Sequence, residues 1–134
     1  MRIAVVVGLV LVVAGLVYVR FAPSDPDQWH VAVEGDADAD YPGGALRVVS
    51  AEPATFEAAD AYMQALPRTQ VLAGSVEAGR VTYVTRTRVI GFPDYTTLEY
   101  ADGTLKAFAR LRFGQSDLGV NRERLEGLLA AIQR

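Results

Sequence analysis

Cysteine is absent from the 134-residue chain, and His30 is its single histidine. The lack of cysteine excludes disulfides, thiolate nucleophiles and cysteine-ligated metal sites, and such a chain passes safely through an oxidising compartment. A Ser-His-Asp triad would have to use His30, and the residues around Ser116 do not form a nucleophile elbow. Glycine-rich phosphate loops and dinucleotide fingerprints are also missing. We therefore expect no enzyme activity, no cofactor and no bound metal.

Positive charge is also limited. The chain has 13 basic and 16 acidic residues, which gives a net charge of -3. This balance provides no overall attraction to nucleic acid, so we expect no nucleic-acid partner. Hydrophobic residues make up 51% of the chain, and part of that share lies in the first twenty residues. The remainder is long enough for one globular domain.

The longest apolar run extends from Ile3 to Val19, between Arg2 and Arg20. Its length reaches the low end of the roughly 17–25 residues that span a bilayer. It is longer than the apolar core of about 7–15 residues in a cleaved signal peptide, and no good small-x-small cleavage site lies near its end. We therefore expect residues 1–22 to form an uncleaved signal anchor, a single-pass transmembrane helix.

The charges around this run predict its orientation. Arg2 precedes the run, and the segment after Arg20 carries six acidic residues before the next base, Arg47. A short basic amino terminus before a first apolar segment usually stays cytoplasmic. We therefore expect an inner-membrane protein with a cytoplasmic amino terminus and a periplasmic domain.

Residues 23–44 contain three prolines, three glycines and six acidic residues. This composition is typical of a connector, so we expect an extended acidic linker without a core of its own. Trp29, His30 and Val31 interrupt the polar segment. Tryptophan in a polar connector usually packs on something, so Trp29 is expected at the domain edge or at the membrane interface.

The patterns over residues 45–134 predict an α+β domain. Strands are expected over residues 45–51, 70–76, 80–90, 95–100 and 105–113. One helix is expected to start at an N-cap, Thr55, and to end at Pro67; a second runs from Arg122 to about Ile132. The fold should have two layers, with one antiparallel sheet of 4–5 strands and both helices on one face.

The pair Asp102-Gly103 between two alternating runs predicts a β-hairpin. A two-residue loop there sets Tyr100 opposite Leu105 and Tyr95 opposite Arg110. A four-residue loop over residues 91–94 would set Arg86 opposite Glu99 and Arg88 opposite Thr97. The face expected beneath the helices contains Tyr83, Val89, Leu98, Tyr100, Leu105, Ala107, Leu111 and Phe113.

The opposite face of the predicted sheet is rich in arginine. This predicted arginine face is a candidate surface for a partner or an anion, and it consists of Arg86, Arg88, Tyr95, Phe108, Arg110 and Arg112. Its guanidinium groups outnumber the nearby acids, and its two rings offer flat apolar contacts. The alternative is a solvated sheet face with cross-strand pairs such as Arg86–Glu99–Lys106.

Two polar loop segments, GFPDY at residues 91–95 and SDLGVNRER at residues 116–124, stand out near the end of the chain. A structural role is expected for Gly91, Pro93, Asp94, Ser116, Asp117, Gly119, Asn121 and Arg122. Asn121 is the expected N-cap of the last helix, Gly114 and Gly119 are expected at positive φ, and the Ser116 and Asp117 side chains are expected to bind loop amides.

These two segments resemble the family called domain of unknown function 1499, and the chain is similar to a membrane-anchored bacterial member. The resemblance implies a fold unit and no reaction, because the family has no established activity. Two functions therefore remain open. The chain is either a non-catalytic accessory or assembly subunit of an inner-membrane complex, with other membrane subunits and lipids as partners, or a periplasmic domain that binds a small anionic or lipid ligand.

Overall fold

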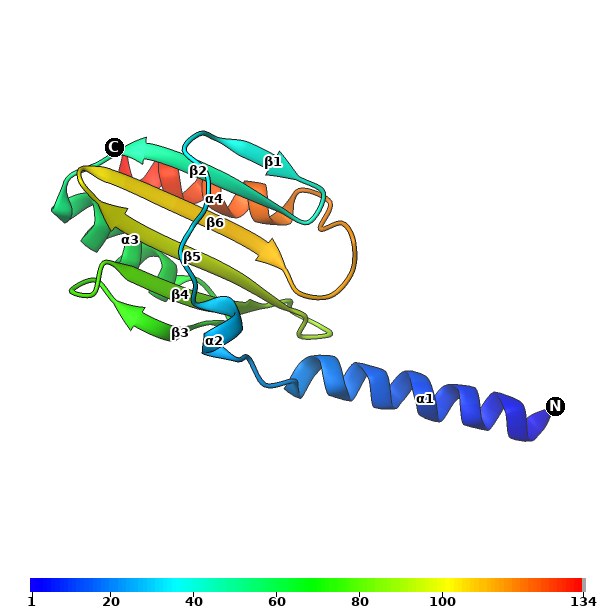
Figure 1. The fold of residues 1–134 in the computed structure, drawn as a ribbon. Helices are drawn as coiled ribbons and strands as arrows, with labels where there is room; N and C mark the ends of the chain where they lie inside the picture. Colours follow the sequence, from blue (N-terminus) through cyan, green and yellow to red (C-terminus); the bar gives the residue numbers. More distant parts are fainter. Residues whose placement is uncertain (134) are drawn as a thin grey trace.

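The computed structural model describes residues 1–133. Four helices and six strands follow one another along the chain (Figure 1). Their bounds are α1 (Arg2–Phe21), α2 (Pro26–Trp29), β1 (Ala39–Tyr41), β2 (Gly44–Ser50), α3 (Pro53–Ala65), β3 (Thr69–Ser75), β4 (Arg80–Arg86), β5 (Pro93–Ala101), β6 (Thr104–Leu111) and α4 (Val120–Ile132).

The six strands form one antiparallel sheet in the order β1-β2-β6-β5-β4-β3. The antiparallel α+β architecture is confirmed. The expected number of strands, 4–5, was wrong because β1 adds a further strand at one edge of the sheet. The register of the β5–β6 hairpin is confirmed, with Tyr100 opposite Leu105 and Tyr95 opposite Arg110. Asp102 and Gly103 both have positive φ, as a tight two-residue hairpin loop requires.

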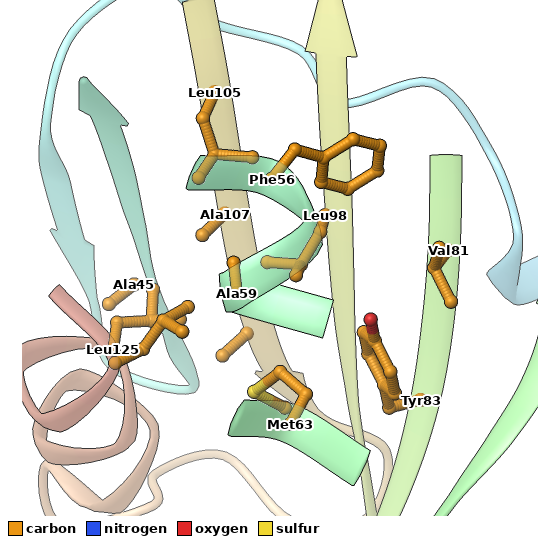
Figure 2. Close-up of a cluster of buried hydrophobic side chains, with 12 residues drawn as sticks. Ala45, Phe56, Ala59, Met63, Val81, Tyr83, Leu98, Leu105, Ala107 and Leu125 are labelled. Atoms are coloured by element: carbon orange, nitrogen blue, oxygen red, sulfur yellow. The ribbon is translucent and has the colours of Figure 1, made fainter. Parts of the chain in front are cut away.

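Helices α3 and α4 cover one face of the sheet, and the main hydrophobic core lies between these layers (Figure 1). Figure 2 shows Phe56, Ala59 and Met63 of α3 beside Leu98 of β5, while Leu125 of α4 lies near β2. Of the eight residues expected on this face, Tyr83, Leu98, Leu105 and Ala107 are fully buried. Alternation along the predicted strands thus identified this part of the core correctly.

The end of β4 differs from the expectation. The strand stops at Arg86 and not at Ile90, so Arg86 lies opposite Pro93, and Arg80 takes the expected place opposite Glu99. Residues 87–92 form a loop that is closed by the Thr87 hydroxyl, which accepts hydrogen bonds from the Gly91 and Phe92 amides. Val89, expected in the core, is therefore 84% exposed.

Both long domain helices start earlier than expected. The N-cap of α3 is Glu52 and not Thr55, because Pro53 occupies the first turn, where its missing amide is no loss. The N-cap of α4 is Gly119 in a left-handed conformation, and Asn121 lies inside the helix. Gly114 and Gly119 have positive φ as expected. Val120 remains 45% exposed, while Leu125 is fully buried.

Residues 22–38, here called the strap, cross the sheet face opposite α3 and α4 (Figure 1). The prediction of an extended linker over residues 23–44 was wrong, because this segment contains α2 and β1 and its side chains bind the sheet. Trp29 stacks on Tyr95, with ring centroids 4.1 Å apart. Val33 is buried, and His30 Nδ1 lies 2.8 Å from Thr82 Oγ1. The sheet is therefore covered on both faces.

Helix α1 extends away from the domain (Figure 1). It has 20 residues, none of them buried, and an 18-residue stretch of it has a mean hydropathy of 2.6, so it is long and apolar enough to cross a membrane. A helix of this kind serves either as a membrane anchor or as a signal sequence. Its last turn contacts the domain, where the Tyr18 and Phe113 rings lie edge to face with centroids 6.2 Å apart.

Candidate functional site

The strap covers the centre of the predicted arginine face. The Arg110 guanidinium lies between the Trp29 and Phe108 rings, with its carbon 5.7 Å and 4.9 Å from the two centroids. It donates to the Trp29 carbonyl at 2.6 Å and to the Thr97 hydroxyl at 2.8 Å. Burial lowers the pKa of Arg110 to about 10, against the opposing effect of Tyr95. Arg110 is therefore part of the strap contact and is not available to a partner.

Arg112 is used in the same way. Its Nη1 donates to the Pro23 carbonyl at 2.7 Å and to the Tyr95 hydroxyl at 3.1 Å. The Tyr95 hydroxyl also lies 2.8 Å from Ser24 Oγ. Three members of the predicted arginine face, Tyr95, Arg110 and Arg112, thus bind the strap. A fourth, Arg86, donates from Nη2 to the carbonyl of Ala22 at the start of the strap, at 3.4 Å. Tyr95 itself is fully buried.

The alternative predicted cross-strand pairs among Arg86, Glu99 and Lys106. Glu99 and Lys106 do form ion pairs, but with other residues. Glu99 pairs with Arg80 at 2.7 Å, because β4 ends four residues earlier than expected. Lys106 lies opposite Glu99 in the register but forms its ion pair with Asp36 of the strap, at 3.1 Å. Burial and the charge of Arg80 lower the pKa of His30, which lies on the same face.

The two loop segments that carried the resemblance meet at the start of α4. Asn121 is fully buried, and its Nδ2 donates to Asp117 Oδ2 at 2.8 Å and to Asp94 Oδ2 at 3.2 Å. Arg124 donates to Asn121 Oδ1 and lies 3.8 Å from Asp94. Burial raises the pKa of Asp94, although Arg124 and Asn121 act against it. We call Asp94, Asp117, Asn121 and Arg124 the loop lock.

Asp117 closes the loop before α4. It accepts hydrogen bonds from the Gly119 amide at 2.9 Å and from the Asn121 amide at 3.1 Å. Although burial opposes the change, these bonds lower the pKa of Asp117. Ser116 accepts from the Leu118 amide, whereas Arg122 is exposed. The expected roles of Ser116 and Asp117 in binding loop amides are therefore confirmed.

Arg86 and Arg88 lie away from the centre of the strap, in an open cleft of about 600 Å³ where α1 meets the domain. The cleft lies between the end of α1, the start of β3, the end of β4 and the loop over residues 87–92. None of its lining residues carries a carboxylate, and four of them are arginines: Arg20, Arg68, Arg86 and Arg88. We call these four residues the arginine cleft. Within residues 1–133 none of them forms an ion pair.

Three of these side chains donate to backbone carbonyl groups. Arg86 Nη1 donates to the Gly91 carbonyl at 2.9 Å and to the Val19 carbonyl at 3.3 Å, so it links β4 to the end of α1. Arg68 has a positive φ of 54° and donates from Nε to the Arg86 carbonyl at 3.0 Å. Arg20 Nη1 reaches the Val89 carbonyl at 3.4 Å, and Arg88 is exposed.

Sequence reasoning missed Arg20 and Arg68 as members of a site. Arg20 was assigned only to the membrane boundary, and Arg68 lies in the turn between α3 and β3, outside the alternating strands. The available signal was that Arg68 follows Pro67 at a helix end, where the chain turns back toward the sheet. That signal indicates a turn and does not indicate what the turn approaches.

The family model described as protein of unknown function (DUF1499) matches residues 19–132. The chain belongs to the DUF1499 family. The match begins at the end of α1 and includes the strap, so the DUF1499 unit starts earlier than the expected boundary at residue 45. No curated protein matches this DUF1499 chain.

Two other kinds of site, a metal site and a pair of free carboxylates, find no support in this DUF1499 domain over residues 1–133. Residues 1–133 contain no group of three or more histidine, cysteine, aspartate or glutamate side chains that would hold a metal ion. The loop lock has two carboxylates, but their oxygens are bound to amides and lie beside Arg124. The arginine cleft is therefore the candidate functional site.

Proposed function

We propose that this DUF1499 chain is a non-catalytic, membrane-anchored periplasmic domain that binds an anionic group in the arginine cleft. One observation carries the proposal: four guanidinium groups line a cleft that has no carboxylate among its lining residues. Like charges held together repel one another, and an anion between them offsets this repulsion. Guanidinium groups bind phosphate and carboxylate in a bidentate manner, so the ligand belongs to one of these two classes.

The arrangement of the side chains supports this proposal. Carbonyl groups hold Arg86 in place, and Arg68 is held at its Nε atom, which leaves the two Nη atoms of Arg68 for a ligand. Arg88 is exposed at the rim. The cleft thus combines the fixed charge of Arg86 with the two Nη atoms of Arg68 and the exposed guanidinium of Arg88. We propose that Arg68 and Arg88 make the direct contacts.

The proposed location uses the charges that flank α1. Arg2 is the first residue of the helix, and the strap that follows carries Asp25, Asp27, Glu34, Asp36 and Asp38. This distribution favours a cytoplasmic amino terminus and a domain on the other side of the inner membrane. The absence of cysteine from the full sequence suits the periplasm. The arginine cleft would then lie on the periplasmic side, beside the end of the span.

The double variant Arg68→Gln/Arg88→Gln tests the cleft. We expect at least a tenfold loss of affinity, about 1.4 kcal/mol, because each charge-assisted hydrogen bond contributes about 1.5–3 kcal/mol. The measurement is calorimetric titration of the full chain in non-ionic detergent, once with inorganic phosphate and once with a short-chain phosphatidylglycerol. Binding should weaken as salt rises.

The matched control is Lys106→Gln/Arg122→Gln, which removes the same charge outside the cleft. It should keep the affinity of the unaltered chain. The proposal fails if the cleft variant binds both probes as tightly as this control does. Binding of inorganic phosphate alone indicates a soluble anion, and binding of the phospholipid alone indicates a lipid headgroup.

A second candidate function, an accessory subunit of an inner-membrane complex, is supported by the open surface of α1. Gly8 and Gly15 lie seven residues apart on one side of the helix, and a Cβ atom added at either would meet no other atom within 4 Å. Small residues at this spacing permit close packing of another transmembrane helix. The proposed partners are the spans of other membrane subunits.

The variant Gly8→Leu/Gly15→Leu tests this candidate. After gentle detergent extraction and native size analysis, the unaltered chain should migrate in a larger assembly, and this variant should not. Val10→Leu/Val17→Leu is the control, because these residues follow Gly8 and Gly15 by two positions, about 200° around the helix, and so add bulk at the same spacing on the opposite side of α1. A lone monomer from the unaltered chain would eliminate the accessory-subunit candidate and would leave the arginine cleft as the functional surface.

A further inference from the structure

Two loops at one end of the domain expose large apolar side chains. Val89, in the loop over residues 87–92, is 84% exposed, and Leu118, in the loop between β6 and α4, is 92% exposed. The strand register places both loops at the same end of the sheet, where β4 and β6 finish. Helix α1 leaves the domain at this end (Figure 1). The exposed apolar tips and the apolar helix therefore lie together.

Contacts with the last turn of α1 fix the height of these two loops along the axis of the helix. Phe113, at the start of the second loop, packs edge to face on Tyr18. The Val89 carbonyl accepts a hydrogen bond from Arg20 at 3.4 Å. In a membrane-spanning α1, the last turn with Tyr18 and Arg20 is the part suited to the headgroup region, where aromatic rings and basic side chains are enriched. The two loops lie level with this turn.

The two ends of the domain differ in their free charges. At the end that faces α1, the carboxylates of Asp40, Asp94 and Asp117 are bound by Arg47, Arg124 and a loop amide. Arg112 and the four residues of the arginine cleft lie at the end that faces α1. The opposite end exposes Glu52, Glu77 and Asp102 in the turns after β2, β3 and β5. An anionic membrane surface attracts juxtamembrane basic groups and repels carboxylates. The charge distribution therefore favours the same orientation as the apolar loops.

We infer that the domain docks directly on the phospholipid bilayer, with the tips of the loops over residues 87–92 and 113–119 inserted in the interfacial layer. This inference rests on the proposed membrane span of α1 and goes beyond the anion site. The docked domain turns the mouth of the arginine cleft to the lipid headgroups. It also limits the motion of the domain about the end of α1.

Because the chain has no cysteine, single cysteines introduced for labelling provide a direct test. Val89→Cys and Leu118→Cys carry a nitroxide label in the full chain, reconstituted in nanodiscs of phosphatidylcholine and phosphatidylglycerol. Ser50→Cys, exposed at the opposite end of the sheet, is the matched control. Accessibility to oxygen, relative to a water-soluble nickel complex, should be several-fold higher at positions 89 and 118 than at position 50.

Equal ratios at all three positions would overturn the docking inference, because the loops would then lie in water. The same labels in the Arg68→Gln/Arg88→Gln background separate docking from ligand binding. In this background, labels that stay inserted although anion binding is lost would show that docking does not depend on the anion site. Inserted labels in an unaltered chain that binds neither phosphate nor phosphatidylglycerol would support docking and refute the proposed anion site. Aqueous labels in a chain that binds the probes would do the reverse.

Discussion

Replacing Trp29 by alanine should destabilise the domain by about 3 kcal/mol, the low end of the range for truncation of a packed tryptophan. The indole stacks on the buried Tyr95 ring and covers one side of the Arg110 guanidinium. Its removal exposes the ring face of Tyr95 and leaves Arg110 without the aromatic surface above it. We therefore expect the strap to detach before the sheet unfolds.

Urea unfolding of the full chain in detergent, followed by far-ultraviolet circular dichroism, measures the loss of stability. Limited proteolysis measures strap release, with new cleavage expected within residues 22–38. Gln28→Ala, an exposed neighbour in α2, is the control and should stay within about 0.5 kcal/mol of the unaltered chain. A Trp29→Ala chain as stable and as protease-resistant as Gln28→Ala would show that the strap is a loosely attached linker.

Replacing Asp94 by alanine should be comparably destabilising, by about 3 kcal/mol, because it breaks a buried ion pair from one side. Asp94 is 7% exposed, and its carboxylate accepts from the buried Asn121 amide and lies beside Arg124. Its loss leaves the Arg124 charge without this partner. The start of β5 and the start of α4 then lose the side chains that join them.

Trp29 fluorescence during urea unfolding provides the measurement, since this tryptophan is stacked in the folded domain. Asp94→Asn should cost less than Asp94→Ala, because an amide oxygen still accepts from Asn121. Glu57→Ala, an exposed carboxylate of α3, is the control for loss of one negative charge. If Asp94→Ala unfolds at the same urea concentration as Glu57→Ala, the loop lock contributes nothing to stability.

Local signals explain which parts of the fold were predictable. Asp102-Gly103 determines the β5–β6 register because the hairpin requires only the residues around the turn. The alternation of apolar residues along β5 and β6 indicates the buried face because alternation is also local. The alternation of polar and apolar residues continues past Arg86, however, and so predicted a β4 that extends to residue 90. The Thr87 hydroxyl ends the strand by binding two amides further along the chain, and alternation does not record this contact.

The strap and the arginine cleft depend on contacts between residues far apart in sequence. Trp29 binds Tyr95 and Arg110, 66 and 81 residues later, so composition alone indicated a connector. The hairpin register placed Arg110 on the correct face of the sheet, but it did not predict that Trp29 of the strap covers Arg110. Arg68 enters the cleft through its turn after α3. Of the predicted arginine face, only Arg86 and Arg88 line the cleft.

The route of the strap has a consequence for the order in which the chain assembles. The strap follows α1 immediately, whereas the strands on which it lies, β4, β5 and β6, begin only at residue 80. During synthesis the strap emerges long before its binding surface exists. Its closure is therefore a late step in folding, after the hairpin of β5 and β6 has formed. Until then Tyr95 and Arg110 stay open to water, and closing the strap draws the finished sheet toward the end of α1.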